Sequence, residues 1–369
     1  MKKLFWHFLS NRWNSAITEY AISCARANLL QGVDVHFFPL RGSPAERRTV
    51  DLMATTSISG FGLDSLPMLL SAARRTKPDV IFTYGGPETV LAGIISRVTN
   101  TKVIRFRGEA IRSSSVLYRW RQRLSLDALD MIMAPSQRLA SELSAIGVKA
   151  PIESITLGCD TARFYRPDSV AAISEDRPII LIFGRLDPVK GHSLMIQRMA
   201  QILALWGDKP RKPALHIVGE PANVTVAQLE EETRKAKLTL GSDVVISTLR
   251  VDNVAGLLAS AALGVVPSLG SEIICRVAQE FLLCGTPVAV SGAGSLPEVL
   301  FDDAGFCFNG QSIEADIEAF TNWISRSLNE SAELKVKRAK RARAFYSFEA
   351  MADRLSQVFR SHFGWESVS

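Results

Sequence analysis

The chain has 369 residues, of which 47% are hydrophobic and 22% charged, and a formal net charge of +6. These proportions are typical of a globular protein of two or three domains, at roughly 150 residues per domain. No apolar run reaches the ~18 residues of a transmembrane helix. The apolar start, residues 1–13, is short, contains His7 and lacks a small-residue cleavage site, which favours a first buried strand over a signal peptide. Five scattered cysteines without a CxxC pair favour reduced thiols and a cytoplasmic location.

The positive charge is concentrated in the first half of the chain. Residues 1–170 hold 22 Lys and Arg against 14 Asp and Glu, a balance of +8, whereas the remainder holds 21 against 23. Such an asymmetry indicates an anionic partner for the first half. The five histidines are isolated in the sequence, so no metal site is predicted.

Short apolar runs alternate with longer amphipathic segments in the first half. An apolar run at 3–9 precedes a helical pattern at 16–32, which Gly32 is expected to end. Further strands are predicted at 33–38, 79–84, 102–106, 131–135 and 151–157, with helical patterns between most of them.

Residues 163–178 break this rhythm, because they are polar and contain Pro167 and Pro178, and they are predicted to form a linker. The alternation then restarts, with predicted strands at 178–184, 214–219, 243–247, 263–268, 286–291 and 305–308. Strands that alternate with helices favour parallel sheets with right-handed crossovers. The two series therefore predict two Rossmann-like domains that face each other across a cleft. From about residue 312 the chain is expected to be helical, with a basic helix at 333–345 and a bend near Tyr346–Ser347.

Two cations follow the first predicted strand of the second series. Arg185 comes directly after Gly184, and Lys190 precedes Gly191 at the start of a helical pattern. Ligands of open parallel sheets bind at the carboxyl ends of the strands, and a planar guanidinium together with a compact ammonium suits a diphosphate. Taken alone, the two residues are better explained as a solvated pair of surface cations.

Two glutamates bracket an apolar stretch in SEIICRVAQE, residues 271–280. A helix is predicted from near Ile273 to a point before Gly285, a residue suited to the left-handed position beyond a helix end. Glu272 would then lie at the helix N-terminus, where free N–H groups favour a phosphate, and Glu280 about two turns further on. Both carboxylates could accept hydrogen bonds from sugar or ribose hydroxyls. Taken singly, each is better explained by the helix dipole or by a solvated helix face.

Taken together, these motifs resemble those of glycosyltransferase family 4, retaining enzymes of the GT-B fold. GRLDPVKGH at 184–192 is followed by IVGE at 217–220, by SEIICRVAQEFLLCGTPVAVS at 271–291 and by Glu298, in the order that the family shows. SITLGCDTARFYRP at 154–167 resembles the segment that precedes the interdomain linker. The resemblance covers essentially the whole chain and is strongest over residues 150–300.

The resemblance implies an α/β protein of the GT-B fold. It implies an acceptor-side domain over 1–170, a nucleotide-sugar-binding domain over 176–346, and a last helix, about 347–369, that packs back on the first domain. The catalytic residues that it implies are Arg185 and Lys190, which would hold the donor diphosphate, and Glu272, which would bind the donor sugar. The implied donor-binding residues are Gly184, Arg250, Val251, Ile273, Ile274 and Glu280. The implied acceptor-side residues are Asn14, Ser15, Arg107, Glu109 and Arg112.

The sequence departs from the family pattern in three places. Ile273, Ile274 and Cys275 stand where family members often have Gly-Phe-Gly. The Gly-rich loop after the first strand is replaced by a segment with Asn11, Asn14 and Ser15, and Arg107–Gly108 stands where the family has His-Gly. These changes leave the reaction class intact, but they leave the donor sugar open.

A run of six arginines with one carboxylate spans residues 105–123. A solvated helix face is the default explanation of such a run. Its place in the first domain, and its Tyr118 and Trp120, favour an anionic acceptor or membrane headgroups. Nucleic acid is disfavoured, because no binding motif for it is present.

We therefore expect a retaining, metal-independent glycosyltransferase that moves a sugar from a nucleotide-diphosphate sugar to an anionic glycan or lipid-linked acceptor. The co-substrate is expected to be a UDP-sugar, with GDP- and ADP-sugars as alternatives, and no other cofactor is expected. The process would be the assembly of cell-envelope polysaccharide or lipopolysaccharide, in the cytoplasm or peripherally on the inner face of the membrane.

Two alternatives stay open: another GT-B enzyme, such as a sugar-nucleotide epimerase, and a non-catalytic protein that binds an anionic surface. A Rossmann oxidoreductase is disfavoured, because VSGAGSLP at 290–297 has Pro297 where the fingerprint needs its third glycine.

Overall fold

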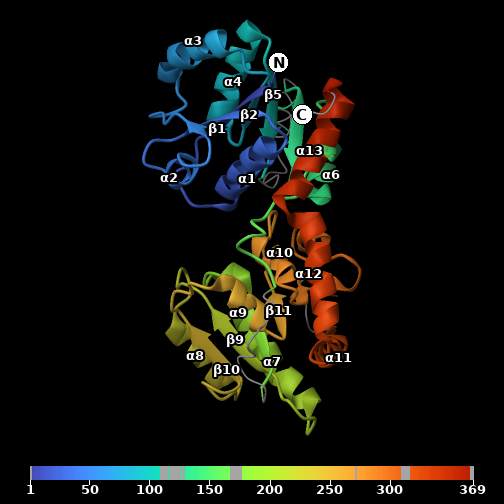
Figure 1. Ribbon diagram of the computed structural model, residues 1–369. Coiled ribbons are helices and arrows are strands. Elements are labelled where there is room, and N and C mark those ends of the chain that lie inside the picture. The colour runs from blue at the N-terminus through green and yellow to red at the C-terminus, as the bar shows by residue number, and fades with distance from the viewer. Residues whose placement is uncertain are drawn as a thin grey trace. The chain divides into compact units, whose positions relative to one another are not determined.

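The computed structural model describes residues 2–108, 116, 126, 129–166, 177–270, 272–308 and 316–365. The chain divides into two units: unit 1 comprises residues 1–158 and 346–369, and unit 2 comprises residues 159–345. Over the described residues, each unit contains one β-sheet whose paired strands run parallel, with α-helices between most successive strands (Figure 1). The predicted α/β class with two parallel sheets is confirmed.

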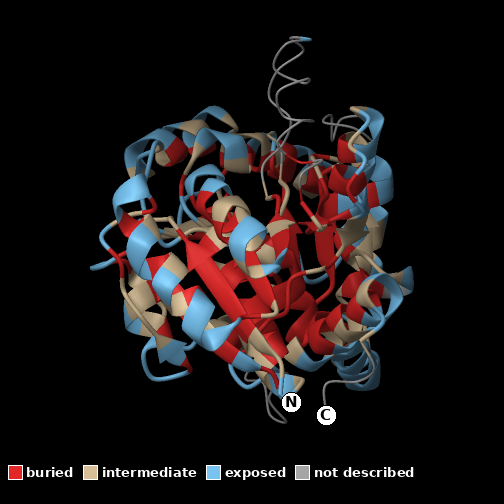
Figure 2. Cartoon of the chain, turned by 90° about the horizontal axis from the view of Figure 1, so that it is seen from above, coloured by how far each residue is buried: buried red, intermediate tan, exposed pale blue. Residues whose placement is uncertain are grey.

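Within the described residues, the sheet of unit 1 has seven strands in the order β3-β2-β1-β4-β5-β6-β7. These strands are β1 (Leu4–Leu9), β2 (Asp34–Pro39), β3 (Ala54–Thr55), β4 (Val80–Thr83), β5 (Lys102–Phe106), β6 (Met131–Ala134) and β7 (Ile152–Ser154). The helices are α1 (Ala16–Leu30), α2 (Pro44–Thr49), the 3₁₀ turn η1 (Leu63–Ser65), α3 (Leu66–Thr76), α4 (Gly86–Thr99), α6 (Gln137–Ala145) and α13 (Phe348–Phe363). Figure 2 shows buried strands between helices whose outer residues are exposed.

Helix α1 forms where the sequence predicts it. The Ser15 hydroxyl accepts a hydrogen bond from the Thr18 N–H at 3.4 Å and so caps the helix start. The helix ends at Leu30, and Gly32 follows in the left-handed region with φ +79°, which confirms the predicted stop. Helix α13 packs on α1: the Arg26 guanidinium lies 4.1 Å from the ring centroid of Phe348.

Unit 2 has a six-stranded sheet over its described residues, in the order β10-β9-β8-β11-β12-β13. These strands are β8 (Ile179–Phe183), β9 (Ala214–Val218), β10 (Val244–Ser247), β11 (Leu263–Val266), β12 (Val288–Val290) and β13 (Gly305–Cys307). The helices are α7 (His192–Trp206), α8 (Val226–Lys235), α9 (Val254–Ser260), α10 (Arg276–Leu283), α11 (Ile317–Ser327) and α12 (Ala332–Tyr346). The 3₁₀ turns are η2 (Pro188–Lys190), η3 (Leu296–Val299) and η4 (Asp302–Ala304). Apolar side chains of the central strands, α7 and α11 form a buried core.

Each strand predicted from the sequence overlaps a strand of the structure. β3 was not predicted, because its two residues are too few to show a periodic pattern. The bend predicted near Tyr346–Ser347 is confirmed: Ser347 is extended, with φ −72° and ψ 164°, between α12 and α13. Among the described residues, no helix has both the length and the apolar character needed to cross a bilayer.

The chain enters unit 2 before the segment predicted as a linker. The Cys159 thiol donates to the Gln279 side-chain oxygen at 3.3 Å, and the Arg166 guanidinium donates to the Cys284 carbonyl at 3.4 Å. Residues 159–166 are therefore part of unit 2, because these contacts fix them against α10 and its end. Residues 167–176 of the predicted linker lie outside the described residues.

A polar cluster lies inside the aromatic core of unit 1. His7 on β1 is fully buried, and its ring stacks on Phe82 with the centroids 4.6 Å apart. The Asn28 amide donates to His7 Nε2 at 3.2 Å, so the neutral ring carries its proton on Nδ1 and donates it to the Tyr84 hydroxyl at 2.7 Å. Burial lowers the pKa of His7 from 6.5 to about 3.

The buried His7 makes unfolding depend on pH. Between pH 6.5 and about 3, His7 binds a proton in the unfolded chain but not in the folded chain. The free energy of unfolding therefore falls as the pH falls. At about 1.4 kcal/mol per pH unit, this group alone should lower the free energy of unfolding by about 2 kcal/mol between pH 7.5 and pH 5.0. His7→Gln should remove this part of the pH dependence of the free energy of unfolding, which is measured by urea unfolding at both pH values. An unchanged slope in His7→Gln would contradict the assignment, whatever the absolute stability of the variant.

Candidate functional site

The central strands of unit 2 bring two loops together at one edge of the sheet. β8 and β11 are hydrogen-bonded neighbours, with Leu263 opposite Ile180, although they are not consecutive in the chain. The strand order reverses between them, and ligands of doubly wound sheets bind outside the carboxyl ends of the strands at such a point. We call this place the β8–β11 edge, formed by the loops that follow β8 and β11.

The two loops are in direct backbone contact. Gly191 has φ +74°, and a Cβ placed on it would lie 2.0 Å from the Pro267 carbonyl oxygen. The Leu269 N–H donates to the Val189 carbonyl at 2.8 Å. A side chain at position 191 would separate the loops, so glycine is needed both for the left-handed turn and for the close approach.

Lys190 and Glu272 meet at the β8–β11 edge as an ion pair. Their side chains are only 31% and 14% exposed, which strengthens the attraction relative to a pair in open water. The Ser268 hydroxyl donates to the same carboxylate oxygen, Glu272 Oε1, at 2.8 Å. Within the described residues, Glu272 Oε2 has no hydrogen-bond partner, so it can accept one from a ligand.

The backbone of Glu272 is fixed by the SGAGS segment that follows β12. The Ser295 N–H donates to the Glu272 carbonyl at 2.6 Å. Gly294 has φ +56°, and a Cβ on it would lie 2.2 Å from the same carbonyl oxygen. In the sequence this segment resembles only an incomplete dinucleotide fingerprint, and its role as the support of Glu272 could not be predicted, because Glu272 lies on another loop.

Helix α10 begins later than predicted. It starts at Arg276, with Cys275 as N-cap, rather than near Ile273. Glu272 therefore lies in the preceding loop and not at the helix N-terminus, because its backbone is bonded to Ser295 instead of entering the helix. The predicted end is confirmed, since the helix stops at Leu283 and Gly285 follows with φ +76°.

Glu280 lies in α10 with a side chain only 8% exposed, so it is not on a solvated helix face. Its Oε1 accepts a hydrogen bond from the Arg276 guanidinium at 3.1 Å, one helical turn away. A ligand hydroxyl at this carboxylate would have to share it with Arg276.

Arg185 is exposed in the loop after β8. Gly184 directly follows the strand, and its backbone N–H donates to the Val218 carbonyl of β9 at 3.0 Å. Asp187 lies two residues further on, and its Oδ2 accepts from Asn223 at 2.8 Å. The hydrogen bonds from Asn223 and the Val189 N–H, helped by the charges of Arg185 and Lys190, lower the pKa of Asp187. The loop thus places a firmly ionised carboxylate beside the two cations.

The other predicted donor-binding residues lie in the segment before α10 and in the segment after β10. Ile273 and Ile274 are half-buried between Glu272 and α10. Arg250 and Val251 follow β10, which is separated from β8 by β9. His192, within the GRLDPVKGH motif but not singled out from the sequence, is buried at the start of α7. Burial lowers the pKa of His192.

The predicted acceptor-side residues are only partly described. Asn14 is exposed and accepts from the Arg48 guanidinium at 3.2 Å, and Ser15 caps α1. Arg107 directly follows β5 and is buried, and its backbone N–H donates to the Met133 carbonyl at 2.8 Å. Glu109, Arg112 and the arginines at 119, 121 and 123 lie outside the described residues.

One carboxylate of unit 1 was missed by the sequence analysis. Glu88 lies in the first turn of α4, directly after β4, and is fully buried. Its Oε1 accepts from the Ser10 N–H at 3.3 Å, and its Oε2 has no hydrogen-bond partner among the described residues. The sheet order of unit 1 reverses between β1 and β4, so Glu88 occupies the corresponding strand edge of unit 1. A single glutamate after two glycines gave no signal in the sequence.

Over the residues that the structure describes, no group of three or more His, Cys, Asp or Glu side chains is placed to hold a metal ion. The charged side chains of the β8–β11 edge are Arg185 and Lys190, which suit an anion, and Asp187 and Glu272, of which Glu272 can accept hydrogen bonds from hydroxyl groups.

Both halves of the chain match families of known enzymes. Residues 168–345 match the family described as glycosyl transferases group 1, and residues 17–163 match glycosyltransferase family 4. The β8–β11 edge lies wholly within the first of these matches.

Curated proteins with similar sequences are glycosyltransferases. D-inositol 3-phosphate glycosyltransferase 2 of Catenulispora acidiphila is 30% identical over 186 residues, 48% of this chain and 43% of that protein. Lipopolysaccharide 1,2-N-acetylglucosaminetransferase of Salmonella typhimurium is 26% identical over 197 residues, 52% of this chain and 50% of that protein. A GDP-mannose-dependent phosphatidylinositol monomannoside mannosyltransferase of Corynebacterium glutamicum is 25% identical over 303 residues, 77% and 76% of the two chains. The chain thus spans about half the length of the first two relatives.

Solved structures resemble the whole chain. A glycosyltransferase of Rickettsia africae has a TM-score of 0.80 at 13% identity, over 99% of this chain and 100% of that one. Anabaena HepE in complex with UDP has a TM-score of 0.78 at 16% identity, over 98% and 100%. At these identities the likeness concerns the fold, and it confirms the predicted GT-B fold.

The support of Glu272 by Gly294 can be tested with a matched pair of glycines. Gly241 also has positive φ, +77°, but a Cβ on it would meet nothing within 4 Å. Gly241→Ala should therefore cost only the backbone strain, of the order of 1–3 kcal/mol. Gly294→Ala adds a clash with the Glu272 backbone and should cost clearly more free energy of unfolding, by at least about 1 kcal/mol, in urea denaturation. Equal costs for the two variants would show that the close approach at Gly294 does not constrain the loop.

Proposed function

Because this chain belongs to glycosyltransferase family 4, we propose that it transfers a sugar from a nucleotide-diphosphate sugar to a glycan or lipid-linked acceptor with retention of anomeric configuration. The observation that carries the proposal is the contact between Lys190 and Glu272 at the β8–β11 edge. A group that binds phosphate and a group that binds hydroxyls lie side by side there, as a nucleotide sugar requires.

In this proposal the donor diphosphate binds to Lys190 and Arg185. The ammonium of Lys190 has three donors, so it can keep Glu272 as a partner while it bonds to a phosphate oxygen. Arg185 is exposed at the strand end and adds a planar fork. The N–H groups of Ile273 and Ile274, which precede α10, would complete the anion site.

Glu272 would orient the donor sugar through its hydroxyl groups. Its Oε1 is occupied by Lys190 and Ser268, so the sugar would bond to Oε2. Ser268 is then a positioning residue, because it holds the carboxylate in one rotamer without touching the sugar. Glu280 would receive the ribose hydroxyls, with Arg276 turning aside or sharing the carboxylate.

The transfer step requires no protein nucleophile. The bond between the anomeric carbon and the phosphate oxygen breaks, and the acceptor oxygen bonds to the same carbon from the same face. The acceptor's proton passes to the leaving phosphate oxygen, so the products are the glycosylated acceptor and the nucleoside diphosphate. The cations at the β8–β11 edge would lower the barrier by stabilising the charge that develops on the diphosphate.

Similar proteins suggest which classes of donor and acceptor this chain uses. Solved HepE contains UDP, and the mannosyltransferase of Corynebacterium glutamicum is named for GDP-mannose. Similar proteins are named for lipopolysaccharide and for phosphatidylinositol mannosides, which supports an acceptor of the cell envelope. We propose a UDP-sugar as donor, and a place of action at the inner face of the membrane.

Lys190→Ala and Glu272→Ala should each lower the transfer rate by about 100-fold or more, the scale of losing one electrostatic contact to a transition state. Lys212→Ala removes an exposed lysine of the same unit and should transfer at the wild-type rate. Transfer is measured as release of the nucleoside diphosphate in the presence of acceptor, with circular dichroism as the control for folding. Near-wild-type turnover in both Lys190→Ala and Glu272→Ala would refute the donor-site assignment.

Transfer should continue in excess EDTA at the rate measured with added Mg²⁺, because the diphosphate charge would be balanced by Lys190 and Arg185. The comparison needs protein that has been dialysed against chelator before the assay. Loss of transfer with EDTA and recovery with Mg²⁺ or Mn²⁺ would show that a metal ion supplies the charge that we assign to the two side chains.

A further inference from the structure

A small pocket with cationic walls lies in unit 2, apart from every residue of the β8–β11 edge. It is lined by Phe301, Asp302, Ala304, Leu334, Lys337, Arg338 and Arg341. Its volume is about 50 Å³, whereas a single water molecule needs about 10–15 Å³. The pocket can therefore hold a group of the size of a phosphate, but not a whole nucleotide.

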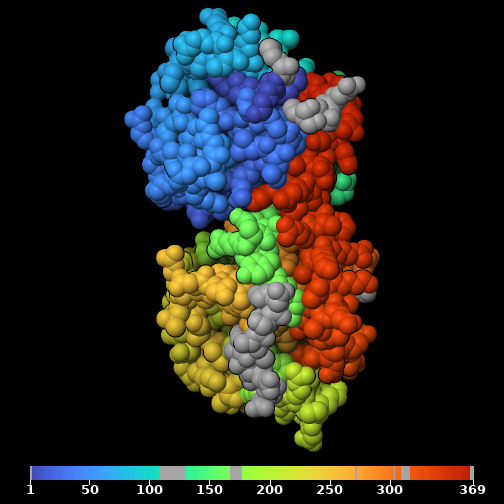
Figure 3. All heavy atoms as spheres, in the orientation of Figure 1, coloured from blue at the N-terminus to red at the C-terminus, as the bar shows by residue number. Residues whose placement is uncertain are grey.

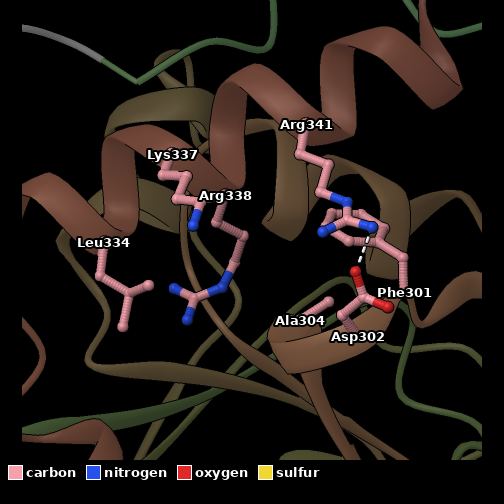
Figure 4. A pocket seen from close by; sticks show the side chains of 7 residues that line it. All are labelled: Phe301, Asp302, Ala304, Leu334, Lys337, Arg338 and Arg341. Carbon is pink, nitrogen blue, oxygen red and sulfur yellow. Dashed lines mark ion pairs between the residues drawn. The ribbon is translucent and has the colours of Figure 1, made fainter.

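Figure 4 shows that the cationic side chains reach into the pocket from one helix. Lys337, Arg338 and Arg341 all project from α12, and Arg341 reaches Asp302 of the segment that also holds Phe301 and Ala304. Residues three and four apart lie on the same face of a helix, so the helical repeat brings the three charges together.

The three cations differ in how well they are neutralised. Arg338 is buried and forms two hydrogen bonds with Glu330, at 2.6 and 2.9 Å, and a third with the Gly285 carbonyl at 2.9 Å. Arg341 pairs with Asp302 at the open side of the pocket, where both side chains are about half exposed. Lys337 has no ion-pair partner among the described residues. Among the described side chains, Glu330 and Asp302 balance two of the three cations, so one positive charge of the pocket stays uncompensated.

Helix α12 as a whole carries more positive charge than its neighbours neutralise. Its 15 residues include six Lys or Arg and one Glu. Like charges at spacings of three or four residues, such as Lys337 with Lys340 and Arg341, destabilise a helix by about 0.2–0.5 kcal/mol per pair. The helix lies open on the face of unit 2 that Figure 3 shows. An anion bound at Lys337 and Arg341 would relieve this repulsion.

We propose that the pocket binds a phosphate group, carried either by a soluble phosphorylated compound or by a phosphate-bearing lipid headgroup. Lys337 is its point charge, and Arg341 turns one edge of its guanidinium from Asp302 to the phosphate. Arg341 is steered by the Phe301 ring, whose centroid lies 5.4 Å from the guanidinium carbon. The Asp302 carboxylate repels the phosphate and competes with it for Arg341, so it lowers the affinity.

The test uses the full chain and inorganic phosphate as the probe, titrated by calorimetry at constant ionic strength. We expect a dissociation constant in the millimolar range, about 1–10 mM, as for one small group of this kind. The double variant Lys337→Gln/Arg341→Gln should bind phosphate at least tenfold more weakly. The control Lys340→Gln/Arg343→Gln removes the same charge from exposed positions of α12 outside the pocket, and it should change the affinity less than twofold.

Asp302→Asn provides a test in the opposite direction. It removes the competing carboxylate and should strengthen phosphate binding about threefold or more. Phosphate bound at the β8–β11 edge would be the same in all of these proteins, so the differences between variants report the pocket alone.

Vesicles distinguish the two sources of phosphate. If the carrier is a lipid, vesicles with 20% phosphatidic acid bind wild-type protein, free phosphate competes, and the pocket variant loses binding while the control variant keeps it. If the carrier is soluble, the calorimetric differences appear and the vesicles do not bind. Equal weakening in the pocket and control variants, or no saturable phosphate binding in the wild type, would overturn the proposal and leave α12 as a solvated basic face.

Discussion

The candidate site depends on one constraint, the pairing of β8 with β11 in the middle of a parallel sheet. This pairing brings two loops to the same edge although 82 residues separate Lys190 from Glu272. Gly191 then allows the loops to touch through their backbones, next to the lysine of one loop that meets a carboxylate on the other. The ion pair between Lys190 and Glu272 therefore depends on the strand order as well as on the two side chains.

Two ion pairs of unit 2 differ in how far their side chains are exposed to solvent, and this difference distinguishes a pair that can bind a ligand from a structural pair. The Arg338 and Glu330 side chains are 3% and 14% exposed, and the arginine also bonds to a backbone carbonyl. Removing either partner would leave a buried charge, so this pair is structural. The bond from Arg338 to the Gly285 carbonyl fastens α12 to the residues that follow α10. Lys190 is 31% exposed, and one oxygen of Glu272 still lacks a partner among the described residues. That pair can admit a ligand, because its charges are not yet fully satisfied.

The sequence was sufficient for features that depend on neighbouring residues and insufficient for those that depend on distant ones. Strands such as β1 and helices such as α1 follow from periodicity, capping and a terminal glycine. The start of α10 was predicted three residues too early, because Ser295, which holds Glu272 out of the helix, lies on another loop. The positions of Glu88 and Ser268 at the strand edges were missed for the same reason. Each contacts a partner that another segment of the chain supplies, Ser10 for Glu88 and Glu272 for Ser268. The roles assigned to Glu272 and Lys190 came from the family resemblance, and their contact in the structure supports them without testing them.

The net charge of a long segment does not by itself locate an anion site. The first half of the chain has a balance of +8 and the second −2, yet both anion sites argued from the structure lie in unit 2. The reason is the range of the interaction, because exposed charges are screened within about 8–10 Å at ordinary ionic strength. What matters is which cations share a few ångströms of surface. Lys190 and Arg185 both act on Asp187 in one loop, and Lys337 and Arg341 line one pocket, within a segment whose total charge is slightly negative.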